Sequence, residues 1–157
     1  MNKIGVMVGD LGASQLSYNV VKKLNDQCKN NKDDFVAFIE NITNFVVEPA
    51  FAVLGVNEIW SFDGVLIATS VSTASHMIKA VNPSQKYFYV WDLEWMRPHG
   101  HDFQYNVKAF NDPSIQLIAR SQDHALAIKN YCNRDVAGIV DDFNIDQLYE
   151  VIGYVTN

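Results

Sequence analysis

The chain has 157 residues, of which 48% are apolar and 19% are charged. This length is typical of one domain, and the composition is that of a globular protein rather than a disordered one. Twelve basic residues against eighteen acidic residues leave a net charge of −6. That charge argues against general nucleic-acid binding, because phosphate binding requires clustered Lys and Arg.

The two cysteines, Cys28 and Cys132, match neither a disulfide framework nor a zinc motif. The reducing cytoplasm is therefore the simplest expected location. The N-terminus leads directly into an apolar strand and predicts no signal peptide, and no apolar run reaches membrane-spanning length. We expect a cytoplasmic protein with no membrane partner.

The first forty residues predict a strand, a helix and a second strand. Residues 4–8 and 35–39 are short, nearly continuous apolar runs, a pattern typical of strands buried on both faces. Between them, apolar residues recur at helical spacing over 16–24, with polar residues on the opposite side. A glycine-containing turn, 9–14, connects the first strand to this helix.

The stretch 43–56 fits two different local structures. Residues 49–54 could form a short helix with Pro49 in its first turn, where proline is well tolerated. Alternatively, residues 45–47 could form a strand fragment. The sequence does not decide between them.

The second half of the chain continues to alternate strands with helices. Strands are predicted in four short apolar runs, at 65–69, 87–91, 115–119 and 136–140. Helices are predicted between and after them, at 70–81, 121–131 and 144–155. Ser72 or Thr73 is the expected cap of the helix at 70–81, and Ser121 is the expected cap of the helix at 121–131.

Strands that alternate with helices predict a mainly parallel sheet with helices on both faces. Because no repeat, low-complexity segment or linker interrupts the pattern, residues 1–157 are expected to form a single Rossmann-like, three-layer α/β domain. Ligands of such sheets bind beyond the carboxyl ends of the strands, near a switch in strand order. The loops that follow the predicted strands are therefore the candidate sites.

The first candidate site is the turn after the strand at 4–8. Its glycines let the backbone approach a ligand, and the next helix offers free N–H groups to an anion. However, the spacing is neither the dinucleotide fingerprint nor the P-loop, and Asp10 opposes phosphate binding. Two interpretations stay open: a ligand-binding loop of Gly9, Asp10, Gly12 and Ser14, or a tight connection in which Ser14 caps the helix.

The second candidate site follows the aromatic strand at 87–91. In strand geometry Asp92 and Glu94 would share one side, as an acid/base pair, a metal site or a clamp for sugar hydroxyls. Trp95 could stack on a sugar ring or a base, and Arg97 adds a cation. The alternative is a carboxylate paired with Arg97 beside tryptophans of the core. We favour a functional role over this structural one, because acidic residues directly after so apolar a strand are not explained by the strand itself.

Three further residues complete the candidate set. His99 and His101 are separated by one residue, a spacing that can bind a metal, but one such pair is weak support. A solvated loop is the preferred alternative, which Pro98 and Gly100 support, so we predict no metal site and retain His101 as a catalytic candidate. We also predict no resident cofactor. Ser70 and Ser121 each follow a predicted strand and are candidates for ligand binding.

Four segments, each a strand with the loop that follows it, occur in a recognisable order: 65–70, 87–92, 115–121 and 136–144. This order resembles the N-terminal half of two-domain, Rossmann-like glycosyltransferases. In that family a glycine loop follows the first strand, and a later segment of the form I-I-A-x-S opens a helix, similar to Leu117 to Ser121. The resemblance covers most of the chain and extends to glycosyltransferase-like proteins of large tailed bacteriophages.

The resemblance implies that Gly9 and Gly12 form the glycine loop and that a catalytic base comes from 92–101. It also implies a nucleotide-sugar donor, which that family binds chiefly with a C-terminal domain. Such a domain would begin where this sequence ends, so we expect an acceptor-side half that acts with a partner chain or as a homo-oligomer. If encoded by a phage, the protein would work in the host cytoplasm.

Two other functions remain open from the sequence. One is a non-catalytic binding or regulatory protein built on the same fold. The other is a small nucleotide-binding or flavodoxin-like domain that uses the turn at 9–14.

Overall fold

A computed structural model describes residues 3–30, 34–97 and 103–154. Its strands are β1 (Lys3–Val8), β2 (Asp34–Ile39), β3 (Ala52–Gly55), β4 (Val65–Ala68), β5 (Gln85–Tyr89), β6 (Gln116–Ala119) and β7 (Gly138–Ile139). Its α-helices are α1 (Gln15–Asn30), α2 (Val71–Lys79), α3 (Phe103–Asn111), α4 (Gln122–Cys132) and α5 (Ile145–Ile152). Three short 3₁₀ helices are η1 (Val56–Ser61), η2 (Glu94–Met96) and η3 (Asp141–Phe143).

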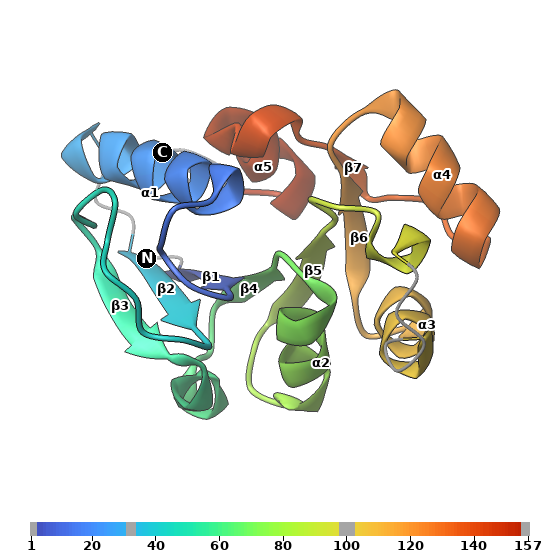
Figure 1. The fold of residues 1–157 in the computed structure, drawn as a ribbon, viewed down its shortest axis with the longest axis horizontal. Coiled ribbons are helices and arrows are strands. Elements are labelled where there is room, and N and C mark those ends of the chain that lie inside the picture. The colour runs from blue at the N-terminus through green and yellow to red at the C-terminus, as the bar shows by residue number, and fades with distance from the viewer. Residues whose placement is uncertain (1–2, 31–33, 98–102, 155–157) are drawn as a thin grey trace.

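The strands form one seven-stranded sheet in the order β3-β2-β1-β4-β5-β6-β7, and every neighbouring pair is parallel. The predicted α/β, Rossmann-like fold is therefore confirmed. The chain starts in the middle of the sheet, builds outward to β3, and then returns to place β4 on the other side of β1 (Figure 1). The strand order thus reverses between β1 and β4, where ligands of such sheets usually bind.

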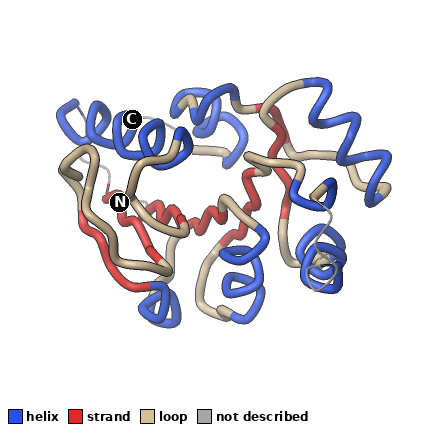
Figure 2. The backbone as a smooth tube through the Cα atoms, in the orientation of Figure 1, coloured by secondary structure: helices blue, strands red, loops and turns tan. Residues whose placement is uncertain are grey.

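The sheet separates two hydrophobic cores. Val6 faces one side and packs with Leu24 of α1, whereas Met7 faces the other side with Met77 of α2. The first core lies under α1 and α5, and the second lies under α2, α3 and α4 (Figures 1 and 2). Burial on both faces explains why β1 is an almost continuous apolar run.

Both predictions for 43–56 are wrong. Residues 45–47 form no strand, and 52–55 form the edge strand β3 where a helix over 49–54 was one alternative. Asn25 of α1 donates to the carbonyl of Glu48 at 2.8 Å and accepts from the Ala50 N–H at 2.6 Å. These bonds hold the loop against α1, and Ala52 then enters the sheet opposite Val36 of β2. Local propensity does not determine the conformation of residues 52–55, and pairing with β2 makes them a strand.

Helix α3 was not predicted. Its nine residues, FQYNVKAFN, are mixed in polarity, and only Asn106, Ala109 and Phe110 are buried. These residues recur at i, i+3 and i+4, the spacing of one helical face, but an asparagine on that face obscures the apolar pattern. The remaining predicted strands and helices all occur, with ends that differ by a few residues.

None of the helices within the described ranges is long and apolar enough to cross a membrane.

The Tyr89 phenol joins the carboxyl ends of β5 and β7. Its hydroxyl donates to the carbonyl of Val140 at 2.8 Å and accepts from the Phe143 N–H at 3.1 Å. Phe143 and its neighbour Asp142 have φ values of 57° and 42°, a strained region for residues other than glycine. Burial raises the pKa of Tyr89 to about 12. The phenol therefore stays protonated and keeps donating to Val140 in the folded state.

Tyr89→Phe should lower the free energy of unfolding by about 1–3 kcal/mol at neutral pH, because it leaves Val140 and Phe143 without a partner. In the wild type the phenol's contribution is fully present below its unfolded pKa of about 10. It is lost as the pH rises toward the folded pKa of about 12.

Urea unfolding at about pH 8 and about pH 11 measures this effect, since the two values bracket the unfolded pKa. The wild type should lose more stability over the interval than Tyr89→Phe, and an exposed Tyr18→Phe control should behave as the wild type. Equal losses in wild type and Tyr89→Phe would contradict the assignment.

Candidate functional site: a pocket between α2, η2 and α3

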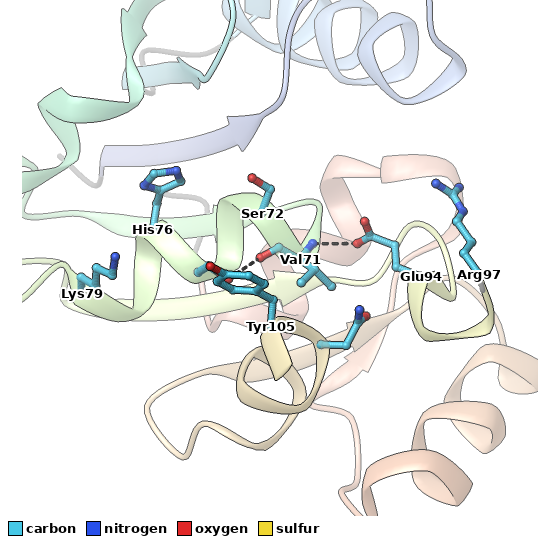
Figure 3. A pocket seen from close by; sticks show the side chains of 9 residues that line it. Val71, Ser72, His76, Lys79, Glu94, Arg97 and Tyr105 are labelled. Atoms are coloured by element: carbon cyan, nitrogen blue, oxygen red, sulfur yellow. Dashed lines mark hydrogen bonds between the residues drawn. The ribbon is translucent and has the colours of Figure 1, made fainter. Parts of the chain in front are cut away.

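A pocket of about 530 Å³ lies between α2, η2 and α3 (Figure 3). Its walls carry hydroxyl, carboxylate, cationic, aromatic and amide groups, from Val71, Ser72, Ser75, His76, Lys79, Glu94, Arg97, Tyr105 and Asn106. Helix α2 follows β4, and η2 follows β5. The Val71 and Glu94 end of the pocket therefore lies at the carboxyl side of β4 and β5, and the rest of the lining follows α2 to Lys79.

The N-terminus of α2 is fixed by two side chains. Ser70 is the N-cap: its Oγ accepts from the Thr73 N–H at 3.1 Å, and the Thr73 hydroxyl accepts from the Ser70 N–H at 3.0 Å. Glu94 Oε2 accepts from the N–H of Val71 at 2.6 Å. The predicted cap, Ser72 or Thr73, is thus wrong by a few residues. A carboxylate beside this strand has a structural reason, because it satisfies a free helix N–H.

Asp92 and Glu94 do not form the side-by-side pair that strand geometry would produce. β5 ends at Tyr89, so the alternation does not extend to these residues. Asp92 Oδ2 instead lies 2.6 Å from Nη2 of Arg97, in an exposed ion pair. Glu94 and Arg97 line the pocket, whereas Asp92 lies outside its lining.

A cluster centred on Glu40 was not predicted. Glu40 directly follows β2, and its Oε1 accepts from the Ser72 hydroxyl at 2.5 Å. The same oxygen lies 3.4 Å from Nε2 of His76. Ser72 and His76 belong to the pocket wall, so Glu40 supports that wall from behind. The available signal was its position as the first residue after a buried strand.

The glycine turn uses its own polar groups internally. Asp10 Oδ1 accepts from the Gly12 N–H at 2.8 Å, and Ser14 Oγ accepts from the Ser17 N–H at 3.0 Å. Ser14 therefore caps α1, as one of the two interpretations proposed. Gly9 borders Glu40, and a Cβ on Gly12 would meet Asp10 Oδ1 at 2.9 Å. The Gly12 and Ser17 N–H groups are thus occupied within the turn, and ligand binding by Gly9, Asp10, Gly12 or Ser14 stays a prediction.

Trp95 and Ser121 lie outside the pocket lining. The Trp95 indole stacks on Tyr131 with ring centroids 4.3 Å apart and meets the edge of Phe110 at 4.8 Å. Ser121 is the N-cap of α4, as predicted, with its Oγ 3.2 Å from the His124 N–H. Ligand binding by either residue stays a prediction.

The remaining predicted site residue, His101, lies outside the described residues, as does His99. Within the described ranges, no group of three or more His, Cys, Asp or Glu side chains is arranged to hold a metal ion.

Ser70→Ala should lower the free energy of unfolding by about 1 kcal/mol, because it removes the side-chain acceptor for the Thr73 N–H. Urea unfolding provides the measurement. Ser61→Ala is a matched control, since its exposed hydroxyl only donates to the nearby carbonyl of Glu58, and it should change stability by less than about 0.5 kcal/mol. A Ser70→Ala variant as stable as the control would argue against this cap.

Comparisons of the chain with protein-family models, with curated proteins and with solved structures each give no match. The resemblance to glycosyltransferases therefore stays a prediction. Function has to be inferred from the pocket and from the loops at the carboxyl edge of the sheet.

Proposed function

We propose that the chain is a glycosyltransferase-like domain that binds an acceptor, a sugar or a nucleotide, in the pocket between α2, η2 and α3. It works in the cytoplasm, or in the host cytoplasm if a phage encodes it. The donor, a nucleotide-sugar, is held with the help of a partner chain or a second copy of this chain. The observation that carries the proposal is the meeting of Glu94, Arg97 and Tyr105 in one cavity.

The pocket has the size and chemistry that a polyhydroxylated ligand requires. Its volume of about 530 Å³ falls within the range usual for small-molecule sites. The Tyr105 ring is 59% exposed and offers an aromatic surface beside the cavity (Figure 3). Carboxylate, hydroxyl and amide groups from Glu94, Ser72 and Asn106 can exchange hydrogen bonds with ligand hydroxyls.

Glu94 is the proposed catalytic base. Its carboxylate lines the cavity, whereas Asp92 lies outside the lining and pairs with Arg97. A carboxylate has about four acceptor positions, so Glu94 can hold the Val71 N–H and still accept from a ligand hydroxyl. In the proposed step, Glu94 removes the proton of the acceptor hydroxyl, and the acceptor oxygen bonds to the anomeric carbon of the donor. The nucleotide leaves with the electron pair of the broken glycosidic bond.

Tyr105→Ala should weaken binding of the acceptor sugar roughly fivefold, the equivalent of about 1 kcal/mol of lost aromatic contact. Calorimetric titration with neutral sugars, sugar phosphates and nucleosides measures the affinity. Tyr18→Ala, which removes another exposed tyrosine on α1, should bind as the wild type does. If no sugar or nucleoside binds the wild type, acceptor binding by this pocket is ruled out.

Glu94→Gln should reduce glycosyl transfer, or hydrolysis of the nucleotide-sugar, by at least about a hundredfold. The glutamine oxygen can still accept from the Val71 N–H, so urea unfolding should show that the fold is retained. The exposed Glu58→Gln serves as the control and should keep full activity. Both are assayed with the donor-binding partner present. Unchanged turnover in Glu94→Gln would remove this residue from the mechanism.

A second candidate function is a non-catalytic binding or regulatory protein on the same fold. It is favoured because several candidate residues serve the fold itself: Ser70 and Ser121 cap helices, and Asp92 pairs with Arg97. This function predicts ligand binding without turnover of any nucleotide-sugar, also when a stoichiometric partner is present. Turnover that depends on Glu94 would exclude it.

A further inference from the structure

The pocket has two chemically different ends. His76 and Lys79 lie toward the C-terminal end of α2, while Glu94 and Arg97 lie at its N-terminal end (Figure 3). Tyr105 of α3 lies between them. A ligand that spans the pocket therefore meets His76 and Lys79 at one end and Glu94 with Arg97 at the other.

The basic end is unusual in so acidic a protein. The chain carries a net charge of −6, yet the two helices that flank the pocket contain no Asp or Glu. Lys79 forms no ion pair with any described residue, whereas Arg97 is paired with Asp92 and His76 faces Glu40. Within the part of the chain that the structure describes, Lys79 is thus the pocket cation that a ligand anion could neutralise.

The opposite end is built to receive hydrogen-bonding groups. Asn106 is a polar side chain only 5% exposed, and it lines this cavity from α3. Glu94 accepts from the Val71 N–H and lines the same cavity. A buried amide and a fixed carboxylate in the same cavity suit sugar hydroxyls, which both donate and accept.

We infer that the pocket takes an anionic sugar, with its phosphate or carboxylate group at Lys79 and its hydroxyls at Glu94 and Asn106. This inference rests on the proposed function and narrows its acceptor from any sugar or nucleotide to a charged one. Attraction to a single exposed ammonium is modest, and salt screens it. The charged sugar should therefore bind more tightly than its neutral counterpart, and less so at high salt.

Calorimetric titration tests the inference with three hexoses, glucose, galactose and mannose, each used as the neutral sugar, the 6-phosphate and the uronic acid. At least one charged form should bind about fivefold more tightly than its neutral parent, a difference of about 1 kcal/mol. Lys79→Gln should abolish that preference. Lys22→Gln, an exposed lysine on α1, is the matched control and should retain the preference.

The outcomes separate the inference from the function on which it rests. Equal affinity for neutral and charged sugars, or a preference that survives Lys79→Gln, overturns the anionic-sugar inference but leaves acceptor binding intact. Inorganic phosphate that binds as tightly as the sugar phosphates also overturns it, because the sugar then contributes nothing. Absence of binding by every sugar and nucleoside overturns the proposed function as well.

Discussion

The candidate site depends on the two side chains that hold the N-terminus of α2. Ser70 caps the helix from the end of β4, and Glu94, which follows β5, accepts from Val71 at 2.6 Å. One helix end therefore connects the carboxyl edges of two neighbouring strands. The groups that line the pocket come from α2, from η2 with the residue after it, or from α3. The contacts of Ser70 and Glu94 with the N-terminus of α2, together with the packing of α3 on α2, set the spacing of these groups.

The same contact holds the Glu94 carboxylate at the wall of the pocket. The positive end of the α2 dipole stabilises its negative charge, and a single oxygen suffices to hold the helix. Glu40 plays a similar part on the other side of α2, where one oxygen receives the Ser72 hydroxyl and faces His76. Three residues of the α2 wall, Val71, Ser72 and His76, thus contact carboxylates that come from loops after β2 and β5.

The sequence predicts the interior of the sheet well and its periphery poorly. Strands such as β1 and β4 are buried on both faces, so their apolar runs identify them directly. β3 is exposed and takes its conformation from β2, and α3 presents a buried asparagine, so neither has a clear pattern. At the site, Glu94 and Arg97 were predicted from their place after an aromatic strand. Glu40 and Ser72 are 32 positions apart, and their hydrogen bond follows only from the strand order.

The reversal of strand order between β1 and β4 also shapes how the chain can fold. β1 is made first, yet it lies in the interior of the sheet, and Ile4 pairs with Val65 of β4. During synthesis, β1 and β2 can pair early. The other edge of β1 stays unpaired until β4, about sixty residues later in the chain, has been made. Contacts of such long range slow folding and leave apolar strand edges exposed meanwhile. A nascent chain that stops before β4 is therefore the form of this protein most in need of a chaperone.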